Sequence, residues 1–130
     1  KISPFTGTDD IVFRVEFSVK KENEAKRSEI AEKAAGYMKQ RVDKGHFKFP
    51  CAGSVFKNNR DFGAPSGQII DEAGLKGYSI GDAQIAPWHG NIIINTGKAG
   101  SKDVKALVDY IKAQIKEEKG FELEEEIIFK

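Results

Sequence analysis

The sequence contains few of the residues on which disulfide and metal chemistry depend. Its 130 residues include one cysteine, Cys51, and two histidines. A single cysteine cannot form an internal disulfide bond, and we expect a reducing, cytoplasmic location. One cysteine and two scattered histidines do not have the clustered spacing of a metal site, so no metal ligand is predicted.

Long apolar runs and an excess of charge of one sign are also absent. Apolar runs such as Ile92–Ile94 are far shorter than the ~20 residues of a membrane-spanning helix. Acidic and basic residues interrupt residues 1–20, which therefore lack a signal-peptide pattern. The chain has 21 Lys and Arg against 20 Asp and Glu, and a nucleic-acid surface needs clustered positive charge. We expect neither a membrane nor a nucleic acid as a partner.

Complete cofactor motifs are missing too. The sequence has no phosphate-binding loop, no Rossmann glycine pattern and no nucleophile elbow. Hydrophobic residues make up 39% and charged residues 32%, which is typical of a soluble globular protein. The length suits one hydrophobic core, so residues 1–130 are predicted to form a single domain. The chain begins at Lys1 without an initiator methionine, and we expect it to be part of a longer protein.

Hydrophobic periodicity predicts a strand and then a long helix in the first part of the chain. Residues 11–19 alternate apolar and polar side chains, which is the period of a half-buried strand. Within residues 24–42, apolar side chains recur at every fourth position, as on one face of a helix. Residues 43–63 have no clear period, so we expect a loop there, with one short strand at residues 55–57.

Two further helices are predicted from their apolar spacing and their end signals. Ser66 is expected to cap a short helix that Gly74 ends. Ser101 is expected to cap a longer helix, with Asp103 in its first turn and Gly120 at its end.

Three strands complete the prediction. Residues 78–86 and 91–95 are expected to be strands joined by a turn at residues 87–90, and residues 121–129 a closing strand. The resulting order is β-α-loop-α-β-β-α-β. It predicts an α+β fold in which helices pack on one face of a small, mostly antiparallel sheet.

Two segments stand out by composition. Residues 51–59 combine small residues with polar ones, and a tight turn leading into a strand explains that composition most simply. Residues 122–126 hold four glutamates, and a charged, solvated edge is the simpler interpretation, because composition cannot choose one as catalytic. Hydrogen bonding in a turn is likewise the simpler role for His89.

Five segments, in the right order and with the right gaps, resemble the UDP-N-acetylenolpyruvoylglucosamine reductase (MurB) family. Residues 52–58, Ala-Gly-Ser-Val-Phe-Lys-Asn, resemble its glycine-serine motif. The other four segments are residues 71–77, 80–85, 89–99 and 120–127. Together they cover nearly all of residues 50–130, so the resemblance implies the carboxyl-terminal, substrate-binding domain of that family.

The resemblance implies one part of a flavin-dependent reductase. The family uses FAD and NADPH to convert UDP-N-acetylglucosamine enolpyruvate to UDP-N-acetylmuramate during peptidoglycan synthesis in the bacterial cytoplasm. Its FAD is bound mainly by an amino-terminal domain, which residues 1–130 do not include. The resemblance therefore implies two partners, the UDP-sugar and that FAD-binding domain, and implies that the isolated chain is inactive.

The resemblance also assigns roles to five residues. Ser54 matches the family's catalytic acid, and Glu126 matches a glutamate of its closing strand. Asn58 and His89 fall at substrate-binding positions. Lys1 falls at the position of an arginine near the substrate, where lysine keeps the charge but loses the bidentate fork. No residue is assigned to cofactor binding.

A second interpretation is a binding module for a nucleotide sugar that kept the scaffold without the chemistry. Lys1 at the arginine position and Asp82 at a usual glycine position favour this module. The presence of both Ser54 and Glu126 favours the reductase. The reading frame upstream of Lys1 distinguishes the two interpretations.

Overall fold

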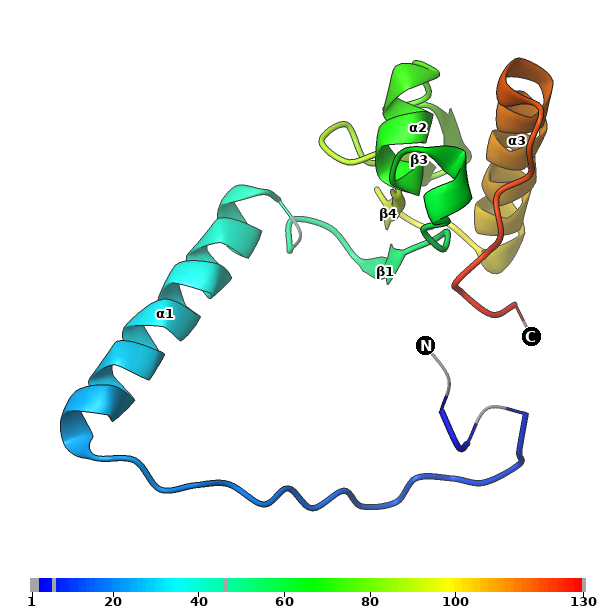
Figure 1. Ribbon diagram of the computed structural model, residues 1–130. Coiled ribbons are helices and arrows are strands. Elements are labelled where there is room, and N and C mark those ends of the chain that lie inside the picture. Colours follow the sequence, from blue (N-terminus) through cyan, green and yellow to red (C-terminus); the bar gives the residue numbers. More distant parts are fainter. Residues whose placement is uncertain (1–2, 6, 46, 130) are drawn as a thin grey trace. The chain divides into compact units, whose positions relative to one another are not determined.

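A computed structural model describes residues 3–5, 7–45 and 47–129 (Figure 1). The chain divides into two compact units, Lys1–Gly36 and Tyr37–Lys130. The second unit holds the sheet and the hydrophobic core. The prediction of a single domain over residues 1–130 stays a prediction.

The strand predicted at residues 11–19 is wrong. The segment has no regular secondary structure, and Phe13 and Ile11 are 97% and 90% exposed. A strand forms only where a neighbouring backbone completes its hydrogen bonds, and no described residue pairs with this segment. The predicted long helix is confirmed as α1, Glu24–Asp43, and the side chain of Asn23 accepts a hydrogen bond at its first turn.

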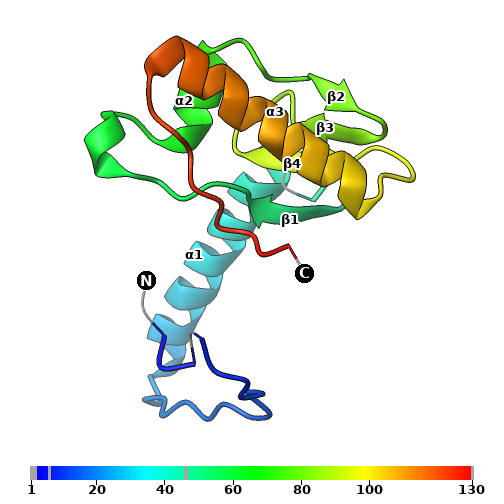
Figure 2. The same ribbon diagram turned by 90° about the vertical axis from the view of Figure 1, so that its right-hand side faces the viewer.

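The sheet has four antiparallel strands in the order β1-β4-β3-β2 (Figure 2). The strands are β1, Cys51–Ser54; β2, Ser79–Ile80; β3, Ala83–Ile85; and β4, Ile92–Asn95. The single strand predicted at residues 78–86 is therefore a hairpin. Gly81, at φ +56°, reverses the chain between β2 and β3, a backbone conformation that glycine adopts readily.

Helices α2, Ser66–Glu72, and α3, Ser101–Lys119, cover one face of the sheet, as predicted. Their side chains pack with Ile85 and Ile93 into the main core. Ile92 and Ile94 point to the other face, where they pack with Ala86 and Trp88. A short 3₁₀ turn, Arg60–Phe62, precedes α2.

The predicted helix caps are each off by one residue. Ser66 and Ser101 are the first residues of α2 and α3, and Pro65 and Gly100 take the cap positions. The Ser66 hydroxyl donates instead to the Lys57 carbonyl at 2.6 Å. Asp103 and Gly120 act as predicted. The Asp103 carboxylate accepts the Gly100 N–H, and Gly120, at φ +79°, follows the end of α3.

The closing segment, residues 121–129, is not the regular strand predicted from its alternation. It meets the chain after β1 at one isolated bridge, Phe56 to Glu125, so residues 55–57 are not a regular strand either. Two backbone hydrogen bonds flank the bridge, from Lys57 N–H to the Glu124 carbonyl and from Glu126 N–H to the Val55 carbonyl. The segment still alternates between exposed and buried side chains, since Leu123 is buried between two exposed glutamates.

An ion pair ties the closing segment to α3. Lys112 Nζ lies 3.1 Å from both carboxylate oxygens of Glu125, and the two side chains are only 22% and 24% exposed. Burial is the largest single influence and acts to raise the pKa of Glu125, but hydrogen bonds, first of all from Lys112, together with the charges of Lys112 and Lys105 hold that pKa below its ordinary value. The closing segment has only one backbone bridge to the rest of the fold, so the ion pair between Lys112 and Glu125 helps to hold it in place.

Replacing Lys112 with methionine should lower the free energy of unfolding by about 1–2 kcal/mol at neutral pH, because the pair is half-buried. A carboxylate with a lowered folded pKa stabilises the fold above its unfolded pKa, and that contribution is lost as pH falls through the folded pKa. The variant should therefore differ least from the parent in acid. Urea unfolding across pH measures this. Lys116→Met, at a side chain 67% exposed, is the control, and equal losses would contradict the prediction.

Candidate functional site

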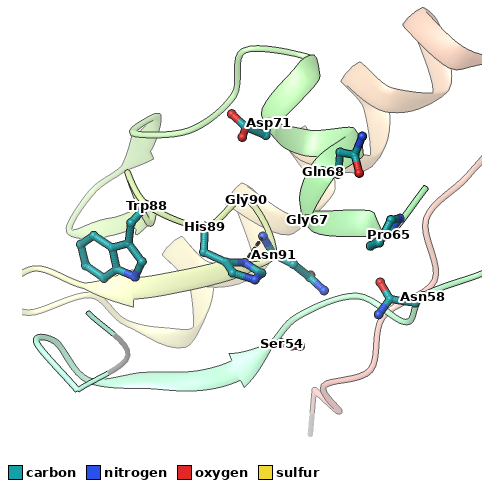
Figure 3. A pocket seen from close by; sticks show the side chains of 10 residues that line it. All are labelled: Ser54, Asn58, Pro65, Gly67, Gln68, Asp71, Trp88, His89, Gly90 and Asn91. Carbon is teal, nitrogen blue, oxygen red and sulfur yellow. Dashed lines mark hydrogen bonds between the residues drawn. The ribbon is translucent and has the colours of Figure 1, made fainter. Parts of the chain in front are cut away.

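A pocket of about 310 Å³ opens between the end of β1, the start of α2 and the turn before β4 (Figure 3). Three of the five predicted site residues, Ser54, Asn58 and His89, lie in its wall. The rest of the wall is formed by Pro65, Gly67, Gln68, Asp71, Trp88, Gly90 and Asn91. The fold therefore brings together predicted residues that are far apart in the sequence.

Ser54 is the last residue of β1 and is exposed at the pocket. Gly53, at φ +83°, precedes it, and the pairing of β1 with β4 is irregular between Cys51 and Ser54. Such a bulge changes the direction of the side chains that follow it. The Ser54 hydroxyl makes no hydrogen bond within the described residues, so it is available to donate to a ligand.

Asn58 has a structural role as well as a place in the pocket. Its Oδ1 accepts the backbone N–H of Ser66 at 3.0 Å, which satisfies one N–H group in the first turn of α2. With the oxygen engaged in this way, the Nδ2 group is what Asn58 can offer a ligand. A ligand atom at this position would therefore be a hydrogen-bond acceptor.

The ring of His89 is oriented by the backbone of the turn. Asn91 N–H donates to His89 Nδ1 at 3.1 Å, so the neutral ring carries its proton on Nε2. Gly67 lies against the ring, and a Cβ atom added there would be 2.9 Å from His89 Cε1. Position 67 therefore needs glycine for the ring to keep this place.

Glu126 does not line the pocket, but the structure separates it from the neighbouring glutamates. Glu122 and Glu125 bind Lys112, and Glu124 binds Lys57. Within the described part of the chain, Glu126 has no ion pair. Its backbone N–H donates to the carbonyl of Val55, the residue after Ser54. The backbone of Glu126 is thus fixed beside the residue that follows Ser54, and its carboxylate has no lysine partner among the described residues.

Trp88 forms a wall between this pocket and a second hollow of about 370 Å³, whose charged lining residues are Lys44, Lys48 and Asp43. The indole Nε1 of Trp88 is buried without a hydrogen-bond partner among the described residues. Lys48 Nζ lies 5.9 Å from the centre of the Trp88 ring, and Phe49 stacks on the same ring at 6.1 Å. This cationic hollow has no signal in the sequence, because it depends on a contact between a loop and a distant turn.

Lys1 lies outside the described residues, so its role stays a prediction. Within residues 3–5, 7–45 and 47–129, no group of three or more His, Cys, Asp or Glu residues is placed to hold a metal ion. None of the helices described is both long enough and apolar enough to span a bilayer.

Comparison with known proteins gives consistent matches. Residues 40–130 match the family "UDP-N-acetylenolpyruvoylglucosamine reductase, C-terminal domain". The chain is 52% identical over 103 residues to the UDP-N-acetylenolpyruvoylglucosamine reductase of Treponema denticola, covering 79% of this chain and 32% of that protein. The corresponding protein of Borrelia garinii is 43% identical over 129 residues, covering 99% of this chain and 41% of that protein.

A solved structure agrees with these matches. The crystal structure of UDP-N-acetylenolpyruvylglucosamine reductase (MurB) from Thermus caldophilus aligns with a TM-score of 0.59 at 43% sequence identity. The alignment covers 76% of this chain and 34% of that one. The chain thus spans well under half the length of the relatives that it matches.

Proposed function

Because the chain belongs to the UDP-N-acetylenolpyruvoylglucosamine reductase family and matches its carboxyl-terminal domain, we propose that it forms the substrate-binding, proton-donating part of such a reductase. The proposed reaction converts UDP-N-acetylglucosamine enolpyruvate to UDP-N-acetylmuramate, in the cytoplasm, for peptidoglycan synthesis. The observation that carries the proposal is the gathering of Ser54, Asn58 and His89 around one pocket.

The chemistry of the two hollows suits a nucleotide sugar. The hydroxyl of Ser54 and the amide nitrogen of Asn58 are both hydrogen-bond donors, and sugars and phosphates present many oxygen acceptors. Lys44 and Lys48 in the neighbouring hollow add positive charge, which favours a diphosphate. A pocket of about 310 Å³ is at the small end of ligand sites, so it would hold one part of the substrate.

The described residues do not fit a flavin dinucleotide. The pocket is too small for it, and the sequence has no phosphate-binding loop. At the start of α2, the Ser66 N–H that could contact a phosphate already binds Asn58. We therefore assign FAD and NADPH, the source of hydride, to an amino-terminal domain joined to this chain. The exposed apolar side chains of residues 11–19 offer that domain a surface to cover.

The chain's own contribution to the reaction is a proton. Reduction of the enolpyruvyl double bond places hydride on the methylene carbon and leaves the neighbouring carbon, beside the carboxylate, as an enolate. A serine hydroxyl is a weak acid, so it donates only to a strongly basic atom within hydrogen-bond reach, and an enolate carbon is such an atom. We assign this donation to Ser54. We assign Glu126 as the second catalytic group, and Asn58, His89 and Lys1 as substrate-binding residues.

The division of labour predicts a difference in colour. The 130-residue chain should purify colourless, whereas the same chain joined to its amino-terminal domain should be yellow with stoichiometric flavin. Visible absorbance spectra of the two proteins, with flavin quantified after denaturation, test this. Stoichiometric flavin in the 130-residue chain would overturn the assignment of FAD to the other domain.

A binding module without chemistry is less well supported once Asp82 is placed in the fold. Asp82 Oδ2 accepts the backbone N–H of Lys98 at 2.7 Å, and the Asp82 carbonyl accepts the N–H of Thr96. A Cβ added at Gly97 would lie 2.7 Å from that carboxylate. The aspartate at position 82, where the family usually has glycine, thus stabilises the turn after β4 through these hydrogen bonds. It has no bearing on whether the chain performs chemistry.

A further inference from the structure

Asn91 is a buried amide whose side chain binds backbone. It is 3% exposed, and only Ser66 shares its class of buried polar residue in the part of the chain described. Its Oδ1 accepts the Phe56 N–H and its Nδ2 donates to the Phe56 carbonyl, both at 2.8 Å. The amide therefore pairs with one residue through both backbone groups, as a neighbouring strand does.

This pairing begins where the ladder between β1 and β4 ends. The last regular pair of that ladder joins Ser54 to Ile92. Beyond it, Val55 N–H donates to the Asn91 carbonyl at 3.0 Å, and the Asn91 side chain then holds Phe56. Asn91 thus continues the register past the irregularity in β1, which fixes the backbone on the carboxyl side of Ser54.

The same residue orients the other side of the pocket. Asn91 N–H donates to His89 Nδ1, so its backbone holds the ring while its side chain holds Phe56. On the opposite side of the dipeptide 55–56, the Val55 carbonyl accepts the N–H of Glu126. The three segments that carry Ser54, His89 and Glu126 therefore meet at the two residues that Asn91 binds.

We infer that Asn91 is a positioning residue, which sets Ser54 and His89 in one register and fixes the Nε2–H form of the His89 ring. It acts through other residues, because both polar atoms of its side chain already bind Phe56. This inference rests on the proposed function for its kinetic consequence, whereas the form of the His89 ring is a property of the protein without substrate.

The test uses the full-length protein with its flavin and the substitution Asn91→Asp. Aspartate keeps the size and one oxygen, but it places its second oxygen against the Phe56 carbonyl, which is buried and would lose its donor. Asn95→Asp is the matched control. The Asn95 side chain accepts N–H groups of Gly97 and Ala99 at the other end of β4, and aspartate can still accept both. It loses only the long 3.4 Å bond from Asn95 Nδ2 to the Ala99 carbonyl, which is part-buried.

In Asn91→Asp, oxidation of the reduced flavin by saturating substrate should slow by roughly 10- to 100-fold, since misplacement of reacting groups by about 1 Å has effects of this size. Flavin reduction by NADPH should stay within about twofold of the parent, because it does not use these groups. Asn95→Asp should match the parent in both steps. Unchanged oxidation by substrate in folded Asn91→Asp would overturn the inference, as would an equal fall in both steps.

A spectroscopic measurement separates this inference from the proposed function. ¹⁵N NMR of histidine-labelled protein, with His89 identified through a His89→Gln variant, should show the Nε2–H form in the parent. Asn91→Asp keeps the backbone N–H that donates to Nδ1, but repulsion between its second oxygen and the Phe56 carbonyl should shift the backbone at position 91 away from the ring, so a mixture of forms is expected. If Asn91→Asp does not fold, Asn91→Ser, which leaves room for a bridging water, should give the same pattern. An unchanged His89 signal would overturn the inference, whereas a parent protein inactive on the substrate would overturn only the proposed function.

Discussion

Replacing Ser54 with alanine in the full-length protein should slow oxidation of the reduced flavin by the enolpyruvyl substrate by roughly 10²–10⁴-fold, the usual range for a lost general acid. Flavin reduction by NADPH should be nearly unchanged, because that step takes no proton from Ser54. Ser54 lies in the wall of the pocket and its hydroxyl makes no hydrogen bond among the described residues, so its loss removes no hydrogen bond from that part of the fold. Substrate affinity should therefore change much less than the rate.

Stopped-flow measurement of the two half-reactions tests this prediction. Ser54→Cys should recover part of the rate, because a thiol is the stronger acid. Ser79→Ala, at an exposed serine of β2 outside the pocket wall, is the control for loss of a hydroxyl. If Ser54 only stabilised a turn, Ser54→Ala would slow both half-reactions alike. Unimpaired oxidation by substrate would remove Ser54 from the mechanism.

Replacing Glu126 with glutamine should lower the rate of substrate reduction by roughly 10²-fold or more, as expected for loss of a catalytic group. Among the glutamates of residues 122–126, it is the one without a lysine partner in the described structure. A carboxylate without a partner is able to interact with substrate without breaking an existing ion pair. The backbone hydrogen bond from Glu126 to Val55 remains in the variant, so the segment should keep its place.

The structure also decides which glutamate is the proper control. Glu125 is unsuitable because its carboxylate holds Lys112, and its loss would disturb the closing segment. Glu124 is 71% exposed and pairs with the exposed Lys57, so Glu124→Gln should change the rate by less than about twofold. Single-turnover rates for the two variants, with thermal unfolding as a check on folding, decide the matter. Small and equal changes in the two rates would identify the glutamates of residues 122–126 as a solvated edge.

Local patterns in the sequence predicted the helices well. The four-residue spacing between residues 24 and 42 and the apolar face of residues 104–115 correspond to α1 and α3. The end of α3 was also predictable, because glycine at position 120 takes a left-handed conformation that other residues adopt at a cost. The caps were each displaced by one residue. At α2, the Ser66 hydroxyl donates to the Lys57 carbonyl, nine positions away, an interaction that local sequence does not show.

Strands were predicted poorly where no neighbouring backbone completes them, whereas β4 was predicted although its partner β1 is distant in sequence. The alternation in residues 11–19 and 121–129 is real, but neither segment has a neighbour that completes a ladder in the described structure. Periodicity reports which side chains prefer burial, and it does not report whether a second backbone is present. Residues 78–86 fail for a different reason, because one glycine, Gly81, divides an apparently continuous pattern into a hairpin.

The sequence by itself determined the family, through five ordered segments, and through that resemblance it predicted roles for Ser54, Asn58, His89 and Glu126. Only the tertiary structure gathered three of these around a pocket and left the carboxylate of Glu126 without a lysine partner among the described residues. It alone showed the hydrogen bonds of Asn91 with the Phe56 backbone and the His89 ring, on which the positioning role that we infer rests. The reason is physical: motifs and periodicity are local along the chain, whereas hydrogen bonds and ion pairs form between groups that folding brings together.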